Sequence, residues 1–195
     1  MNLVTTILRD IGDSLRELFS SSIDELRAVD AIRFDSPGEM SEDAATRLSI
    51  FLYQISINPH LRNEEGMAIG ERQIRHPHLP VDLNYIFTVY AKQRETELNI
   101  TEQLARVMYD NSVLKGDLLK GNLLEQFNTE IYVVPVNLSL DDLNKLWGTF
   151  LNKPFKLSLC YQLTPVMLPS DKPLRSITRV TSEELNTYWK PSAGK

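Results

Sequence analysis

Two runs of residues, 47–57 and 81–91, constrain the fold more than any other part of the chain, because apolar side chains dominate both of them. Side chains of a β-strand point alternately to its two faces, so a run that is apolar at both parities predicts a strand covered twice. We expect 47–57 to be such a strand, central in a sheet. Its faces would carry Leu48, Ile50 and Leu52 on one side and Phe51, Tyr53, Ile55 and Ile57 on the other.

Four further segments have strand character. Residues 130–138 and 155–168 are rich in β-branched and aromatic side chains, and shorter strands are expected at 30–34 and 174–181. Pro135 has no backbone N–H to donate to a neighbouring strand, so that position should lie at an edge or a bulge.

Three segments have the apolar spacing of amphipathic helices. The first, 3–19, repeats apolar residues every three or four positions. The second, 99–110, opens on Asn99, with Glu102 three residues later as in a capping box. The third follows Ser139, a residue type that commonly caps helices, and continues to residue 150. Segment 118–127 fits neither period.

Residues 58–80 stand apart because they are long, carry mixed charges and have weak periodicity. Ordinary connections in compact domains are much shorter, so such a segment is either a functional excursion or an unordered loop. In an enzyme it would be a lid, and in an assembly protein it would be a contact arm. The pattern leaves these alternatives open.

Together the segments predict an α+β fold, sandwich-like, with a mixed, largely antiparallel sheet packed against about three helices. At 195 residues the chain fits one domain of ordinary size. We expect that domain to span 1–181, with 182–195 as a C-terminal tail that is either flexible or ordered by a partner.

Composition excludes several functional classes. A net charge of −5 is unlike the basic face of nucleic-acid-binding proteins, and no apolar run is long enough to span a membrane. Arg9, Asp10 and Asp13 interrupt any apolar leader segment, so no secretory signal is expected. Cys160 is the one cysteine, which suits a reducing compartment. We therefore expect synthesis in the cytoplasm.

Two motifs hint at ligand binding and both are incomplete. Gly116 and Gly121 have the glycine spacing of a phosphate-binding loop, but the required lysine and hydroxyl residue do not follow. His76 and His78, with His60 further away, have no nearby cysteine or carboxylate that would complete a metal-ligand set. We expect no cofactor and no metal.

The sequence also provides little for catalysis. A nucleophilic thiol needs a neighbouring base and an electropositive setting, whereas Cys160 lies in an apolar strand between Leu159 and Tyr161. Adjacent acids such as Asp141 and Asp142 do not by themselves form an acid–base pair in space. We therefore expect no catalytic residues.

An ordered set of segments resembles the N-terminal domain of tail-terminator (cap) proteins from extracellular contractile injection systems. The segments are LSIFLYQISINP (48–59), LRN (61–63), PVDLNYIFTVY (80–90), MYDNSVL (108–114), LNKLWG (143–148) and FKLSLCY (155–161). The chain departs from the family pattern at Ser112, where proline is expected, and at Asn84, where histidine is commoner.

The resemblance implies a structural protein that forms a six-membered ring on the distal end of the tail tube and sheath. Such a ring stops polymerisation and anchors the last ring of the sheath. Its partners would be further copies of the chain and the sheath and tube proteins, in a particle assembled in the cytoplasm and released from the cell. Neither nucleic acid nor a membrane would be a partner.

The interface of this chain is expected in the 58–80 segment and the C-terminal tail, where strand addition to a sheath or ring neighbour is one hypothesis. The candidate interface residues are Arg62, Asn63, Arg72, Arg75, Tyr188 and Trp189. Two alternatives remain: another ring, adaptor or baseplate component of the same machine, or a small cytosolic hydrolase that uses Cys160 with a histidine.

Overall fold

The computed structural model describes residues 7–40, 45, 47–62, 66–69, 73–125, 128–150 and 153–176. The chain divides into two compact units. The main unit comprises Met1–Asn63 and His78–Pro169, and the small unit comprises Glu64–Pro77 and Ser170–Lys195. The predicted boundary between 181 and 182 lies outside the described residues and stays a prediction.

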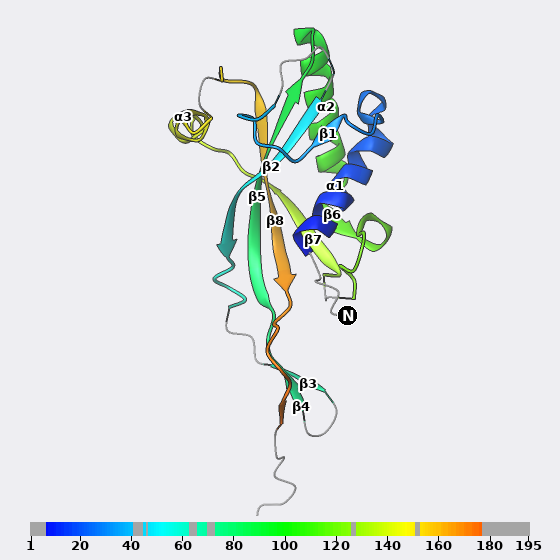
Figure 1. The fold of residues 1–195 in the computed structure, drawn as a ribbon, viewed down its shortest axis with the longest axis vertical. Coiled ribbons are helices and arrows are strands. Elements are labelled where there is room, and N and C mark those ends of the chain that lie inside the picture. Colours follow the sequence, from blue (N-terminus) through cyan, green and yellow to red (C-terminus); the bar gives the residue numbers. More distant parts are fainter. Residues whose placement is uncertain are drawn as a thin grey trace, which may run out of the picture. The chain divides into compact units, whose positions relative to one another are not determined.

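The main unit contains a six-stranded sheet with strand order β1-β2-β5-β8-β7-β6 (Figure 1). Its strands are β1 (Ile32–Arg33), β2 (Arg47–Ile57), β5 (Leu79–Tyr90), β6 (Val113–Lys115), β7 (Glu130–Pro135) and β8 (Ser158–Leu168). Only the β1–β2 pair is parallel. With three α-helices among the described residues, the predicted mixed, largely antiparallel α+β fold is confirmed.

Helices α1 (Ile7–Ser22) and α2 (Arg94–Asp110) cover one face of this sheet (Figure 1). Their apolar stripes meet alternate residues of the central strands in the larger core. Phe19 of α1 is fully buried and meets Phe87 of β5 edge to face, with ring centroids 5.7 Å apart. Because β5 is buried from Pro80 to Val89, it is the strand covered on both faces.

Helix α3 (Leu140–Gly148) lies on the other side of the sheet (Figure 1). It begins as predicted, since the Asp142 N–H donates to the Ser139 hydroxyl at 3.1 Å. Trp147 and Phe150 pack against Ile86 in a second, smaller core. The helix covers only the part of this face that carries Ile86.

The predicted start of α2 at Asn99 is wrong, because the helix begins at Arg94 and its N-cap residue, Gln93, makes no side-chain cap. Glu97 supplies the missing restraint. Its buried carboxylate accepts hydrogen bonds from the Ala91 N–H, at 3.3 Å, and from Arg94, at 2.8 Å, and it forms an ion pair with Lys156. Lys156 is far from Glu97 in sequence, so no local sequence pattern predicts this ion pair.

Segment 58–80, in which no strand before residue 79 was predicted, contains two short strands. In the small unit, β3 (Met67–Ile69) and β4 (Gln73–Arg75) pair antiparallel, and β9 (Arg175–Ser176) pairs with β4. A Cβ on Gly66 would lie 2.6 Å from the Arg75 carbonyl oxygen, so this pairing requires glycine there. None of the small-unit residues whose burial the structure describes is buried.

Candidate assembly surfaces

The β2 side of the main sheet is largely uncovered. In the part of the chain that the structure describes, β1 pairs with β2 only at Leu48 and Ser49, and no other strand lies beside residues 50–57 on the side away from β5. We call this the open β2 edge. Among the described residues, no strand pairs with this stretch on its outer side beyond the Arg33–Ser49 pair of β1 and β2. The prediction of a central strand covered on both faces therefore fails over most of β2, because only Leu48, Ser49 and Ile50 are buried.

Two hydrogen bonds show which backbone groups of this edge point away from β5. The Leu48 N–H donates to the Ala31 carbonyl, at 2.7 Å, so it points away from β5. The Asn58 N–H donates to Pro80 of β5, at 3.0 Å. In an antiparallel pair the direction alternates along each strand, so Ile55 and Ile57 present their N–H and C=O groups outward. These groups can accept an added strand.

Exposed apolar side chains accompany these backbone groups. Ile55 is 48% exposed and Ile57 51% exposed, and both face the α1–α2 side of the sheet. Leu79 on β5 lies on the same face and is 44% exposed. Residues 50–57 contain no proline, no glycine and no charged residue. Proteins usually protect edge strands with such residues, so this edge, interrupted only by a register shift between Leu52 and Gln54, is poorly protected.

The edge on the far side of the sheet is different. β6 is three residues long and carries Lys115, and Gly116 follows at once with a positive φ of 56°. β7 continues beyond β6 only to Pro135, which has no N–H to offer. The prediction that Pro135 lies at an edge is confirmed.

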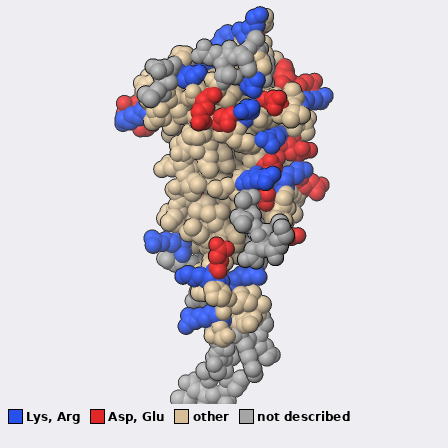
Figure 2. All heavy atoms as spheres, in the orientation of Figure 1, with Lys and Arg blue, Asp and Glu red and all other residues tan. Residues whose placement is uncertain are grey.

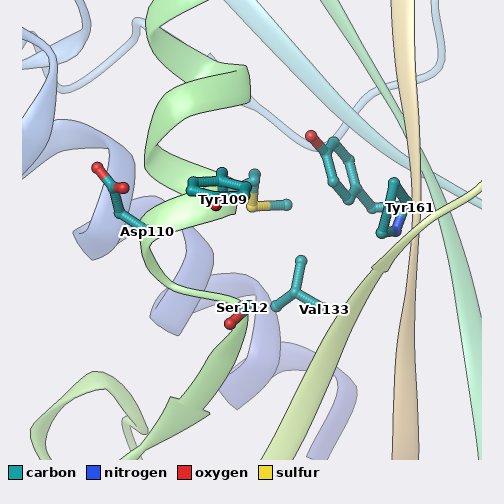
Figure 3. Close-up of a pocket in the computed structure, with 7 residues that line it drawn as sticks. Tyr109, Asp110, Ser112, Val133 and Tyr161 are labelled. Atoms are coloured by element: carbon teal, nitrogen blue, oxygen red, sulfur yellow. The ribbon is translucent and has the colours of Figure 1, made fainter.

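An open groove of about 480 Å³ lies between the end of α2 and strands β7 and β8 (Figure 3). Tyr109 and Tyr161 face each other across it, while Asp110 points away. Tyr109 is 84% exposed, and burial raises the pKa of Tyr161. None of the lining residues is His, Cys, Lys or Arg, so the groove has the aromatic character of a contact surface rather than of an active site.

Charged side chains are unevenly distributed over the main unit. Figure 2 shows that Lys, Arg, Asp and Glu gather around the helices, whereas a band over the central strands on the face in view carries none. A charge-free band of sheet is the kind of surface that protein contacts cover.

A polar cluster lies on the sheet face beyond the reach of α3. The Asp82 carboxylate, in a residue 9% exposed, accepts hydrogen bonds from Asn58 Nδ2, at 3.0 Å, and from the Thr164 hydroxyl. Gln162 Nε2 donates to Asn84 Oδ1 at 3.3 Å. Since these groups satisfy one another, the cluster joins β5 and β8 to Asn58, the residue after β2, and needs no ligand.

Cys160 is buried beside Ile86 and Trp147 in the smaller core. Burial raises the pKa of its thiol to about 11, so it is protonated near neutral pH. A thiol in this state is a poor nucleophile.

The glycine-spaced loop, 116–121, is occupied by the protein itself. The Asp10 carboxylate of α1 accepts a hydrogen bond from the Asn122 N–H at 2.9 Å, and the Ser14 hydroxyl accepts one from the Lys120 N–H at 2.9 Å. A Cβ on Gly121, whose φ is 62°, would lie 2.3 Å from Asp10. The loop therefore docks on α1 and not on a phosphate.

The structure places few of the predicted site residues. Arg62 is exposed in the main unit after β2, and Arg75 is exposed on β4 of the small unit. Asn63, Arg72, Tyr188 and Trp189 lie outside the described residues. The described residues, His60, His76 and His78 among them, contain no group of three metal-ligating side chains, and none of their helices is long and apolar enough to cross a bilayer.

The open β2 edge was not predicted, although the sequence contained a signal for it. The segment before Ser36-Pro37 offers only residues 30–34 as a partner strand, which is too short to cover the length of β2. The Tyr109–Tyr161 groove had no such signal, because its two sides are distant in sequence.

With this geometry in view, comparison with known proteins identifies the class of the chain. A family model described as the Pvc16 N-terminal domain matches residues 10–182. The chain belongs to this family. The resemblance drawn from the sequence is thereby confirmed. A search of curated proteins found no match.

Two solved structures share the fold. One is the sheath/tube terminator of an extracellular contractile injection system, PVC, in its extended state, with a TM-score of 0.70 and 23% identity over 98% of this chain. The other is the tube-terminating cap of the anti-feeding prophage, AFP, with a TM-score of 0.65 and 24% identity over 91% of this chain. The matches span 67% and 60% of those two proteins, which are longer.

Proposed function

We propose that this chain is a structural cap that ends the growth of the tube and sheath of a contractile injection particle. It binds the growing end through repeated contacts and turns over no substrate. Its partners are further copies of itself, in a homohexameric ring, and the sheath and tube proteins, with the ring anchoring the last sheath ring.

One observation carries this proposal. The fold of a sheath/tube terminator extends over 98% of this chain, so the likeness is not limited to a common supersecondary motif. Membership of the Pvc16 N-terminal domain family supports the same function.

The surfaces of the main unit fit a cap. A subunit that ends a polymer must bind one growing end and offer no equivalent end to the next subunit. The open β2 edge can pair with a strand of another subunit, while the β6–β7 edge is short and carries Lys115 and Pro135. This asymmetry suits a protein that joins an assembly and stops it.

A catalytic function is disfavoured by the only thiol. Cys160 is buried and its pKa is raised, so its thiol is protonated and a poor nucleophile near neutral pH, which disfavours the alternative of a thiol hydrolase. We therefore propose a non-enzymatic role. The particle is assembled in the cytoplasm and released with its cap in place.

Electron microscopy of particles made without this chain tests the proposal. We expect tubes and sheaths of variable and abnormal length, because nothing ends their growth. Particles of normal, uniform length with intact sheaths would refute the terminator function.

Two complementation variants serve as controls. Wild-type chain should restore uniform length, and Cys160→Ala should do so equally well, because a structural cap needs no thiol. Restoration by wild type but not by a folded Cys160→Ala variant would point to thiol chemistry instead.

A further inference from the structure

The open β2 edge has no strand beside it among the described residues. It offers outward N–H and C=O groups at Ile55 and Ile57 next to half-exposed isoleucine side chains. An unprotected apolar edge of this length promotes uncontrolled strand pairing unless another strand covers it. Among the described residues only β1 pairs on this side, at Leu48 and Ser49, so a covering strand would come from residues outside the described part of the main unit.

The chain itself contains a suitable strand. β9 ends at Ser176, and the sequence continues with Ile177-Thr178-Arg179-Val180-Thr181. Four of these five residues are β-branched, the class that most favours strands. They follow a segment that is already extended and paired with β4.

We propose that residues 177–181 of one copy add as a strand to the open β2 edge of the next copy in the ring. The inference rests on the proposed cap function, since it requires several copies around a closed ring. An edge in one subunit and a tail in the next form a head-to-tail contact, and contacts of that kind close into rings of more than two members. Pairing of two β2 edges would instead produce a two-fold dimer.

The added strand explains both features of the edge. Its backbone satisfies the outward groups of β2, and its side chains cover Ile55 and Ile57, as in strand addition elsewhere. Specificity comes from the opposite edge, where Lys115 and Pro135 disfavour the same pairing.

Thiol cross-linking in whole particles tests this contact. Gln54→Cys places a thiol at an exposed position of the open β2 edge, and Thr178→Cys places one in the middle of the proposed strand. A short bifunctional maleimide tolerates small differences in register. The buried Cys160 gives a low background, measured on the wild-type chain.

The double variant is expected to give a ladder of covalent multimers on a denaturing gel, because each tail joins the next subunit. A cross-link within single chains would overturn the proposal, and so would the absence of any cross-link in particles that are capped and of normal length. In these two cases the cap function still stands. Absence of the chain from the particles would overturn both.

Two further variants control for the geometry. Gln54→Cys alone should remain monomeric on the gel, and covalent dimers would show that two β2 edges pair with each other and refute the tail contact. Lys115→Cys combined with Thr178→Cys moves the first thiol to the opposite edge. A ladder as strong as that of the first double variant would show that the tail lacks a preferred edge.

Discussion

The two edges of the main sheet differ in how they are protected. The β6–β7 edge is short, carries Lys115 and ends at Pro135, so further strands are discouraged from pairing there. The open β2 edge is eight residues, 50–57, without charge or proline, and Ile55 and Ile57 are about half exposed. The protein is therefore closed to strand addition on one side and open to it on the other. That asymmetry is what a capping subunit needs.

The comparison also separates residues that stabilise the fold from residues that serve assembly. Both groups include large apolar side chains, but Phe19 is fully buried and Ile57 is 51% exposed. Replacing them should therefore affect different measurements.

The largest effect on stability is expected from Phe19→Ala. Loss of a fully buried phenylalanine leaves a cavity against Phe87 and costs about 3–5 kcal/mol of the free energy of unfolding. For a chain of this size the melting temperature should fall by roughly 10 °C. Urea unfolding measures the loss. Ile57→Ala is the matched comparison and should cost less than about 1 kcal/mol, so equal losses would show that the open edge belongs to the core.

Proline at two adjacent positions of β2 should have a smaller effect on stability. It should distinguish residues that stabilise the sheet from residues needed for assembly more sharply than alanine does. The Ser56 N–H points toward Asp82 on β5, because pairing alternates from the Asn58–Pro80 hydrogen bond. Ser56→Pro should therefore remove a hydrogen bond between these strands and cost about 1–3 kcal/mol.

Ile57→Pro removes an outward N–H instead, so its fold should be close to wild type in stability while its incorporation into particles falls. Urea unfolding and quantification of the chain in purified particles check the pair. Equal incorporation of wild type and Ile57→Pro would contradict an assembly role for this edge.

The smallest effect is a change in pH dependence from Glu97→Gln. Burial alone would raise the pKa of Glu97, but hydrogen bonds from Lys156, Arg94 and the Ala91 N–H outweigh it and lower the pKa below 4.5. The unfolded state therefore binds this proton first, so the contribution to stability is full above about 4.5 and is lost as the pH falls further.

The variant should show a shallower loss of stability than wild type between pH 5 and pH 3 in denaturant titrations. Incorporation of the variant into particles at neutral pH should change little. Glu97 lies on α2, where it binds Lys156, and it is not part of the open β2 edge. Identical acid profiles of the two proteins would show that Glu97 is not ion-paired in solution.

Much of the fold followed from the sequence, and the reasons differ by element. β2 was predicted with its observed bounds, Arg47–Ile57, because a run of eleven residues with strong strand propensity is long enough to be recognised from the sequence. β3 and β4 were missed because strands of three residues are too short to show a period of two. The start of α2 was misplaced because Asn99 resembles a cap, whereas the real restraint, Glu97 with Lys156, is a contact between distant segments.

The candidate surfaces were harder to predict than the fold. Apolar residues at both parities of β2 indicated burial, yet exposure depends on the length of the neighbouring strand, and β1 covers only two residues. Of the six predicted interface residues, Arg62 and Arg75 are exposed and the other four lie outside the described residues, so their role stays a prediction.

The most direct test of the account is the length distribution of particles capped by Ile57→Lys, measured by electron microscopy. A lysine on the open β2 edge should prevent strand addition without disturbing the core, as charged residues do on natural edges. Leu124→Lys is the matched control, since Leu124 is 49% exposed and Ile57 is 51% exposed. We expect variable, abnormal lengths for Ile57→Lys and normal, uniform lengths for Leu124→Lys. Uniform, normal particles with a folded Ile57→Lys chain would contradict it.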